Sequence, residues 1–558
     1  MEAGAGKGER KFAANSSRKL SSRTPRGARK QVPPMSVPRI LPALIASLFA
    51  AFSAWAAEVP FVAKGEHVVL VVWDGMRPDF IRADTTPVLH ALATRGTFFG
   101  NNHSVYITST EVNGTAIATG CHPGRNGILA NVEFRPDIHP LHPIATEHPQ
   151  SCRRGDEVRE GKYVRVPTLA EIVQRAGHRT AIAGTKPVAL LHDRGLDRAA
   201  SQGSTVVYAG KANPPAALAP IIEALGKFPP YPDVETLEPN TAQNAWTARA
   251  LTEQLWRDGV PKFSTLWLGD PDYTQHLTMP GSPSALAAMA ACDAALGTIV
   301  TTLRAKGVLE KTNIFIVSDH GFSTVEWNVD LSGALKKAGF TTVRAYTKEP
   351  QPGQILQVAT GGSTAFYVPG RDPEVVGKLV TFLQSTNYAG VIFTRTALPG
   401  TFAMKDARID SPDSPDVLLS FRWKEGKNTH GVTGLLAAEG RRNNYGTHAS
   451  LSRYDIHNTL VAAGPDIRAA FRDTLPTANV DVAPTILHLL GIPGADKMDG
   501  RILREALAGV EFPAPKPETK TIEVTAPAAV GTWRQYLKIT TLGDHTYLDE
   551  GNSGPVPK

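Results

Sequence analysis

Five short segments of the 558-residue chain carry carboxylate, imidazole and hydroxyl side chains at positions where a strand or turn would end. Mixed carboxylate and imidazole ligands favour Zn²⁺, because Mg²⁺ and Ca²⁺ prefer oxygen ligands alone. Three carboxylates and three imidazoles are enough to hold two cations that share a bridging phosphate, as in phosphoryl transfer. The candidate residues are Asp74, Thr110, Asp272 with His276, Asp319 with His320, and His448.

Thr110 stands before a run that is compatible with a helix, Glu111 to Ala118, and Thr119-Gly120 closes that run. A hydroxyl at a helix N-terminus meets unpaired backbone N–H groups and the positive end of the helix dipole, which stabilise an alkoxide or a phosphoryl group. Asn113 follows one turn later, so we expect its amide to donate to a non-bridging phosphate oxygen. The alternative is that Thr110 only caps the helix.

Four apolar runs predict buried strands, and each of them leads into polar residues. His67 to Trp73 is continuous, β-branched and apolar, as expected of a strand with both faces buried, and it ends at Asp74. The carboxyl ends of parallel strands are where α/β enzymes place their sites. The sequence therefore predicts an α/β fold with a mostly parallel central sheet. The other runs are Thr180 to Ala183, Phe263 to Leu268 and Asn313 to Val317.

The ends of the last three runs carry further candidates. Lys186 follows Gly184-Thr185, and we expect it to contact the substrate, with a solvated surface lysine as the alternative. Asp272 and His276 have a D-x-x-x-H spacing, which lets one short turn present an oxygen and a nitrogen to a single cation. Asp319 and His320 are adjacent, and buried ionisable groups need a partner or a metal; a plain surface turn is the alternative.

The order of strand-like and helical segments predicts one catalytic core with an inserted module. The core would comprise residues 57–328 and 441–511. The pattern loosens between them, so residues 329–440 are interpreted as a small α/β insertion that shapes the site. Residues 512–558 would form a Pro-rich linker and then an edge hairpin that includes Tyr536 to Thr541.

The N-terminal residues predict export. Residues 1–34 are basic and lack apolar periodicity, and we interpret them as a wrongly assigned start or a basic tail. Residues 35–56 contain an apolar run and end in Ala54-Trp55-Ala56, a small-x-small cleavage site, which predicts a signal peptide; an N-terminal anchor is the alternative. No other apolar run approaches about 18 residues, so we expect a mature periplasmic or extracellular protein without a membrane span.

The net charge gives no reason to expect a nucleic-acid-binding module. The formal charge is +7, but residues 1–56 hold ten Lys or Arg and two Glu, so the remaining chain has a formal charge of −1. The three cysteines are too few for a disulfide scaffold, although Cys121 and Cys152 could form a disulfide in an oxidising compartment.

The ordered motifs resemble the alkaline phosphatase superfamily, most closely its type I phosphodiesterase/nucleotide pyrophosphatase branch. The resemblance covers roughly Val68 to Leu507 and implies the three-layer alkaline-phosphatase-like core. Each motif is weak alone, whereas all five in the family's order are specific. They are strand-Asp74-Gly75, Thr110-x-x-Asn113 followed by Ala118-Thr119-Gly120, Pro271-Asp272-x-x-x-His276, Ser318-Asp319-His320-Gly321 and Gly446-Thr447-His448.

The resemblance implies a small phosphate ester as substrate and two Zn²⁺ per chain. Thr110 would attack phosphorus in line to give a phosphothreonine, while Asn113 and the Glu111 N–H would hold a non-bridging oxygen. Family members often have Thr-Phe-Pro-Asn, and Glu111 departs from that pattern, which puts the apolar nucleobase slot in doubt. The implied ligands are Asp272, His276 and His448 for one zinc, and Asp74, Asp319 and His320, with the Thr110 oxygen, for the other.

Three alternatives stay open. A monoesterase or phosphonate hydrolase could use the same scaffold, but monoesterases carry Lys-x-Arg where this chain has Lys186-Pro187-Val188, so diesters should be better substrates. A secreted binding protein without catalysis is disfavoured, because no position of the metal set is missing. The segment Cys121 to Arg125 fits the C-x-P-x-R motif of sulfatases, but it follows Thr119-Gly120 and does not occupy the nucleophile position.

Overall fold

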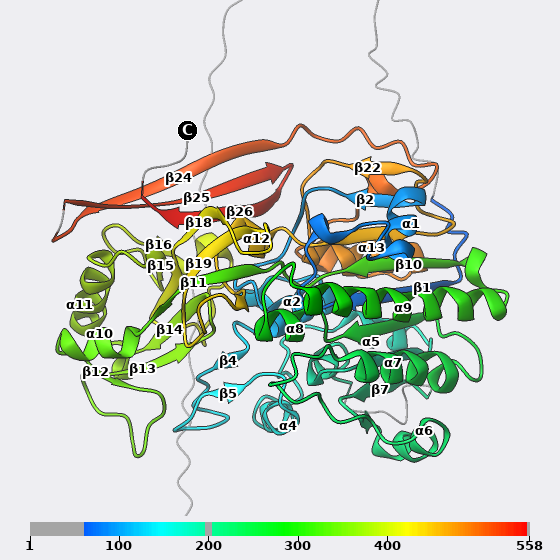
Figure 1. The fold of residues 1–558 in the computed structure, drawn as a ribbon, viewed down its shortest axis with the longest axis horizontal. Helices are drawn as coiled ribbons and strands as arrows, with labels where there is room; N and C mark the ends of the chain where they lie inside the picture. The colour runs from blue at the N-terminus through cyan, green and yellow to red at the C-terminus, as the bar shows by residue number, and fades with distance from the viewer. Residues whose placement is uncertain (1–60, 196–202, 530, 555–558) are drawn as a thin grey trace, which may run out of the picture. The chain divides into compact units, whose positions relative to one another are not determined.

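A central sheet of nine strands, counted within residues 61–195, 203–529 and 531–554 that the computed structural model describes, organises the protein (Figure 1). Its inner strands are mutually parallel, and antiparallel strands flank them on both sides. The predicted mostly parallel sheet is therefore confirmed. In spatial order the strands are β22 (Phe471–Asp473), β2 (Thr97–Phe99), β21 (Leu460–Ala463), β10 (Thr312–Val317), β1 (His67–Trp73), β9 (Phe263–Leu268), β6 (Thr180–Gly184), β7 (Thr205–Tyr208) and β8 (Lys211–Asn213).

The predicted basic extension, residues 1–34, and signal peptide, residues 35–56, lie outside the described residues. Residues from Phe61 onward cluster into one compact unit. The boundaries expected at residues 328, 440 and 511 therefore stay predictions.

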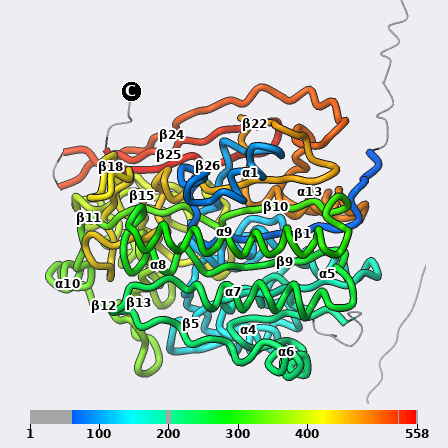
Figure 2. The backbone as a smooth tube through the Cα atoms, turned by 45° about the vertical axis from the view of Figure 1, so that its right-hand side comes forward, coloured from blue at the N-terminus to red at the C-terminus, as the bar shows by residue number. Residues whose placement is uncertain are grey.

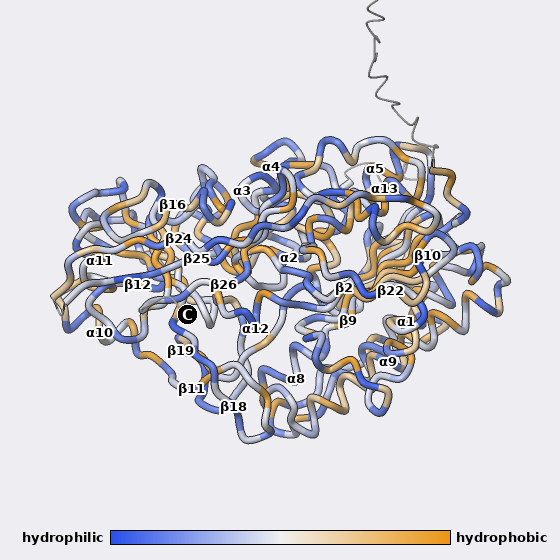
Figure 3. The backbone as a smooth tube through the Cα atoms, turned by 90° about the horizontal axis from the view of Figure 1, so that it is seen from above, coloured by the Kyte–Doolittle hydropathy of each residue, from blue (hydrophilic) through white to orange (hydrophobic). Residues whose placement is uncertain are grey.

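The side chains of β1 alternate between two hydrophobic cores. Val68 and Leu70 belong to the core on one face of the sheet, and Val69 and Val71 belong to the core on the other. Because both faces are buried, the strand has no polar face, which explains its uninterrupted apolar sequence. Figure 3 shows the hydrophobic residues gathered in the strands of the central sheet.

Helices cover both faces, so the core has the three layers that were expected. One face carries α2 (Thr110–Thr119), α5 (Leu169–Arg175) and α13 (Val482–Leu490). The other face carries α1 (Pro87–Arg95), α7 (Thr241–Arg249) and α9 (Pro283–Ala305). Figure 2 shows α7 and α9 running side by side along that face.

Helix α9 passes the length and composition test for a membrane span, which the sequence reasoning did not anticipate. Within the described residues it is the helix that does so. Its own residues Met289, Cys292 and Leu296 are buried in the hydrophobic core, and core helices of soluble proteins pass the same test. The helix is thus accounted for as a layer of the fold.

A second α/β region lies between β11 (Ser323–Val329) and β20 (Gly446–Thr447). These two strands pair with each other, so the region leaves and re-enters the core at one place. Its helices are α10 (Leu331–Lys337) and α11 (Pro373–Gln384). One sheet contains β12 (Thr341–Val343), β13 (Gln354–Ala359), β14 (Ser363–Tyr367), β17 (Val417–Phe421), β15 (Ala389–Thr394) and β16 (Phe402–Ala403), and another contains β18 (Trp423–Lys427), β19 (Thr433–Glu439), β11 and β20.

The C-terminal strands β24 (Glu518–Pro527), β25 (Thr532–Leu542) and β26 (His545–Ser553) form a sheet of their own, not the expected edge hairpin. Gln535 of β25 fixes this sheet to β15, because its side chain accepts from Ile392 N at 2.8 Å and donates to Ile392 O at 3.0 Å. His103 of β3 (Asn102–His103) holds β26 through Asp549 Oδ1 at 3.0 Å. These long-range contacts are invisible in local sequence.

Candidate metal centre

The predicted site residues come together at the carboxyl edge of the central sheet. Asp74 follows β1, and Asp319 and His320 follow the neighbouring strand β10. Asp272 is the first residue of α8 (Asp272–Leu277), which follows β9 on the other side of β1. Gly75, directly after Asp74, has φ +73°, and a Cβ there would lie 3.1 Å from Asp272 Cα, so this close approach of two ligand-bearing segments requires glycine.

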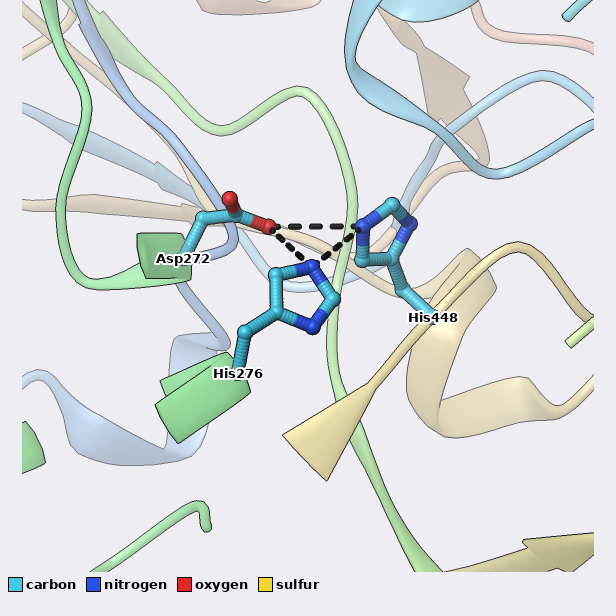
Figure 4. Close-up of side chains that lie close together, drawn as sticks. All are labelled: Asp272, His276 and His448. Atoms are coloured by element: carbon cyan, nitrogen blue, oxygen red, sulfur yellow. Dashed lines mark hydrogen bonds and ion pairs between the residues drawn. The ribbon is translucent and has the colours of Figure 1, made fainter. Parts of the chain in front are cut away.

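Asp272, His276 and His448 form one group of potential metal ligands (Figure 4). Asp272 Oδ1 lies 3.3 Å from the Nε2 atoms of both histidines, and the two Nε2 atoms lie 3.1 Å apart. Each Nδ1 faces a backbone carbonyl, at 3.1 Å for His276 and 2.8 Å for His448, so each Nδ1 carries the proton. Both Nε2 atoms then present lone pairs to the same point, which a cation can occupy.

Asp74, Asp319 and His320 gather beside Thr110 as a second group. His320 Nε2 lies 3.6 Å from Asp74 Oδ1 and 3.3 Å from Asp319 Oδ2. Thr110 Oγ1 lies 3.5 Å from Asp74 Oδ1 and 3.4 Å from His320 Nε2. Asp272 Oδ1 also lies 3.8 Å from His320 Nε2, so the two groups are contiguous.

Two carboxylate oxygens without hydrogen-bond donors indicate whether these residues suit a metal. Asp272 Oδ1 and Asp319 Oδ2 are buried and accept no hydrogen bond in the described structure. The other oxygen of Asp319 accepts from Gly75 N at 2.9 Å and His320 N at 3.0 Å, so the backbone fixes which oxygen stays free. Buried carboxylate oxygens without donors need a positive charge. The donor set therefore fits divalent cations, and its imidazoles favour zinc.

The pKa directions agree with this assignment. Burial, together with the charges of Asp272 and Asp319, raises the pKa of Asp74 well above its usual range. Burial also raises the pKa of Asp319 to about 7. Burial lowers the pKa of both His276 and His448, which keeps them in the neutral form that binds metals.

Lys186 lies among these carboxylates and does not point away from them. Its Nζ lies 2.8 Å from Asp74 Oδ2 and 3.2 Å from Asp272 Oδ2, the oxygens that face away from the imidazoles. Although burial opposes ionisation of Asp272, Lys186 and His276 hold its pKa well below the usual range. The ammonium thus bridges the two ligand groups, whereas the sequence predicted a substrate contact.

Thr110 is the first residue of α2 and is buried. The N-cap position is taken by Ser109, so the alternative that Thr110 only caps the helix does not describe this structure. The predicted helical run, Glu111 to Ala118, is extended by one residue at each end. The Thr110 hydroxyl consequently lies where the helix dipole is positive and faces the second ligand group.

Asn113 is placed differently from its prediction. Its Nδ2 donates to the carbonyls of Val105, Ile107 and Ser109 at 3.0, 3.2 and 3.3 Å, and its Oδ1 accepts from Val105 N at 2.7 Å. The amide therefore braces the loop that leads to Thr110 and has no hydrogen left for a phosphate oxygen. Sequence spacing could not reveal this, because a side chain at this position of the helix can point either toward a bound phosphate or back to the preceding loop.

Two residues at the site were not singled out from the sequence. Asn131 Oδ1 accepts from Glu111 N at 3.3 Å, which puts its amide beside the nucleophile. Arg441 is half-buried and acts electrostatically on Asp272 and His276, yet it makes no hydrogen bond or ion pair with the described residues. Neither residue belongs to one of the five motifs, and Arg441 is followed by a second arginine, as is common in surface loops, so the sequence contained no signal for either.

The cysteines do not form the disulfide that was considered possible. Cys121 and Cys152 are both free and buried. Burial raises the pKa of the Cys121 thiol to about 11, so it is a poor nucleophile near neutral pH. Cys121 also lies beyond the C-terminus of α2, a helix of ten residues and hence about 15 Å long, at the opposite end from Thr110.

A family model described as type I phosphodiesterase/nucleotide pyrophosphatase matches residues 68–425. The chain is 24% identical to human ectonucleotide pyrophosphatase/phosphodiesterase family member 5 over 281 residues, which is 50% of each chain. It is 22% identical to venom phosphodiesterase of Naja atra over 282 residues, 50% of this chain and 28% of that protein. The matches thus span half or less of these relatives' lengths.

Solved structures show the same fold. The murine ectonucleotide pyrophosphatase/phosphodiesterase 5, solved as an inactive variant in complex with AMP, has a TM-score of 0.55 and 18% identity, covering 79% of this chain and all of that one. The human ectonucleotide pyrophosphatase/phosphodiesterase 5 has a TM-score of 0.54 and 19% identity, with the same coverage.

Proposed function

The chain belongs to the type I phosphodiesterase/nucleotide pyrophosphatase family, and on that premise we propose that it hydrolyses phosphodiester or pyrophosphate bonds with two zinc ions and a threonine nucleophile. The observation that carries this proposal is the position of Thr110 Oγ1, within 3.5 Å of both Asp74 Oδ1 and His320 Nε2. A buried hydroxyl at a helix N-terminus beside a metal-ligand set suits a nucleophile.

Asp272, His276 and His448 would hold one zinc, and Asp74, Asp319 and His320 the other. Zinc bound there would lower the pKa of the Thr110 hydroxyl and stabilise the departing oxygen. Thr110 Oγ attacks phosphorus in line, the bond from phosphorus to the leaving oxygen breaks, and a phosphothreonine results. Water then hydrolyses this ester and releases the phosphate.

The residues around Thr110 stabilise the charge on the phosphoryl oxygens. The N-terminus of α2 supplies its positive dipole end. The Glu111 N–H already donates to Asn131 Oδ1 and is not free for a phosphate oxygen, so the Nδ2 group of Asn131 would take the donor role that the sequence had given to Asn113 and to that N–H. Arg441 lies toward Asp272 and His276, on the side where the leaving group departs, and would meet an anionic leaving group such as the second phosphate of a pyrophosphate.

Metal analysis combined with turnover tests the core of this proposal. The purified protein should contain about two zinc ions per chain and should hydrolyse bis(4-nitrophenyl) phosphate. A chelator should abolish turnover, and added zinc should restore it. Undiminished turnover by metal-free protein would contradict the assignment.

A phosphomonoesterase is the second candidate, because Lys186 is half of a Lys-x-Arg pair. Its ammonium is already bonded to Asp74 and Asp272, which leaves less positive charge for the extra negative charge of a monoester. We therefore expect diesters to have the higher kcat/KM in a panel of aryl monoesters, aryl diesters and nucleotides. Residual monoesterase activity should fall selectively in Lys186→Ala; a monoester preference in the wild type would favour the second candidate.

Export is also proposed, on the strength of the signal-like residues 35–56. The secreted protein should begin near Ala57. N-terminal sequencing that found residues 1–34 intact would rule out the signal peptide.

A further inference from the structure

Glu111 and Glu147 are two carboxylates next to the nucleophile that the proposed mechanism does not use. Glu111 is only 6% exposed. The Oε2 atoms of both glutamates are buried and have no hydrogen-bond partner in the described part of the chain. Unpartnered buried carboxylate oxygens are costly, so they indicate a missing donor or cation.

The fold brings these two side chains to the same space from distant segments. Glu111 is the second residue of α2. Glu147 follows β5 (Ile144–Ala145), and its carboxylate lies toward the backbone N–H of Val188, in the turn of 3₁₀ helix that follows Lys186. Helix α2 approaches this turn closely because Gly114 has no side chain: a Cβ there would lie 2.9 Å from Val188 Cγ2.

The negative charge of this pair is not neutralised locally. Lys186 is the described cation whose charge acts on both glutamates. Its Nζ is already bonded to Asp74 and Asp272, the two ligand carboxylates. The glutamates are therefore two further acidic groups beside the nucleophile that form no ion pair with a described cation.

The number and type of the free acceptor atoms in this pair indicate which ligand it would bind. Among the described residues, the sets of three or more ligands that could hold a metal do not include Glu111 or Glu147, and Mg²⁺ or Ca²⁺ would need about six oxygens. A quaternary ammonium has no N–H to offer and is usually held by aromatic rings. A primary ammonium has three N–H donors, which match two orphaned carboxylate oxygens.

We propose that Glu111 and Glu147 bind a primary ammonium group on the ester that stays attached to phosphorus, so that preferred substrates are aminoalkyl phosphodiesters. This inference rests on the proposed phosphohydrolase function. The pair adjoins Thr110 and Lys186, whereas the leaving group departs on the side of His276 and His448. The ammonium therefore belongs to the retained group, and the product is an aminoalkyl phosphate.

A pair of isosteric substrates tests the proposal. 4-Nitrophenyl 2-aminoethyl phosphate and 4-nitrophenyl propyl phosphate have the same number of heavy atoms and release the same chromophore. For the wild type, kcat/KM should be about 10- to 100-fold higher for the aminoethyl ester, as for sites that hydrogen-bond a substrate N–H. In Glu111→Gln and in Glu147→Gln this ratio should fall toward one.

The ratio is measured within each protein, so changes in overall activity cancel. Glu157→Gln is the matched control, because Glu157 is exposed on α4 (Pro149–Val158) and, among the described residues, forms an ion pair with Arg154 alone. Its ratio should equal that of the wild type. Equal turnover of the two esters by the wild type, or an unchanged ratio in both glutamine variants, would overturn the proposal. So would a third bound metal, seen by native mass spectrometry, that is lost from those variants.

A binding measurement separates this inference from the proposed function. Thr110→Ala protein, which lacks the proposed nucleophile, is titrated with 2-aminoethyl methylphosphonate and with propyl methylphosphonate, in which a P–C bond that resists hydrolysis takes the place of the bond to the leaving group. The aminoethyl compound should bind about tenfold more tightly, and Glu111→Gln in the same background should remove the difference. Equal binding overturns the inference. Failure of both aryl esters to turn over, with the binding difference intact, would count against the phosphohydrolase assignment alone.

Discussion

Two clusters of charge in this protein, one partly buried and one buried, are balanced in opposite ways. Around Asp413, three arginines lie within 4.0 Å of one carboxylate, and two of them also pair with Glu133 and Asp137. Arg159 Nη1 lies 2.8 Å from Asp413 Oδ2, Arg165 contacts the same oxygen, and Arg135 Nη1 lies 4.0 Å from it. At the metal centre the carboxylates outnumber the cations instead, because Asp74 and Asp272 share the one ammonium group of Lys186.

The pKa values record this difference. Burial alone would raise the pKa of Asp413, but the hydrogen bond from Arg159 and the arginine charges hold it below the usual value. Burial raises the pKa of Asp74 and Asp319 instead. The cost of burying charge is thus offset within the fold at one cluster and left for a ligand to offset at the other. Unbalanced buried charge is what distinguishes the functional cluster.

Removing the nucleophile should give the largest effect. Thr110→Ala should lower kcat for an aryl diester by several orders of magnitude, because no other hydroxyl takes its place, while zinc content stays nearly unchanged. Ser109→Ala is the matched control, since Ser109 Oγ is buried and unpartnered one residue away. A near-normal kcat for Thr110→Ala would mean that water attacks phosphorus directly.

Asp319→Asn should separate metal binding from stability. The amide keeps the oxygen that accepts from Gly75 N and His320 N and replaces only the orphaned Oδ2. Zinc affinity should fall by about 10- to 100-fold or more. The melting temperature of the metal-free protein should stay equal or rise, because one uncompensated buried charge is gone. A large loss of metal-free stability would show that the centre is balanced without metal.

Asp413→Asn should lower stability and leave activity unchanged, in contrast to Asp319→Asn. At pH 7 the free energy of unfolding should fall by about 2–4 kcal/mol, because Arg165 loses its carboxylate partner and Arg135 and Arg159 are left with Glu133 and Asp137, while kcat of the folded enzyme is kept. The pKa of Asp413 is depressed in the folded state, so its contribution is present above the usual value of 3.8 and is lost as pH falls through the folded-state pKa.

Denaturant unfolding at several pH values measures the contribution of Asp413. The difference between wild type and Asp413→Asn should shrink at low pH. Asp410→Asn serves as the exposed control on the same segment and should change little. An equal loss at pH 7 in both variants would remove the distinction between the clusters.

Asp473→Asn should have the smallest effect, with the opposite pH dependence. Burial raises the pKa of Asp473 to about 7, although Leu475 N–H donates to it. A raised folded-state pKa means that stability is complete below about pH 4 and is lost as pH rises through about 7. The variant should therefore match the wild type at about pH 4 and exceed it by about 1–2 kcal/mol at pH 8–9. Equal stabilities at pH 9 would contradict the raised pKa.

Much of the core could be predicted, because its signals are local. The bounds of β1 and β9 match their predicted runs, since uninterrupted apolar stretches define them. The candidate ligands meet because parallel strands end at one edge, although their roles stay predictions. The direction of the Asn113 amide and the partners of Lys186 were not predictable, because contacts across long sequence separations decide them.

The pairing of Ser323 with Thr447 has a consequence for how this enzyme could diverge. These residues lie three positions after His320 and one before His448, so the ends of the second α/β region are held together beside two candidate ligands. Lengthening or shortening the chain between them would add little loop-closure entropy, which grows only slowly with length. Insertions and deletions there can remodel the borders of the site over evolutionary time while His320 and His448 keep their places.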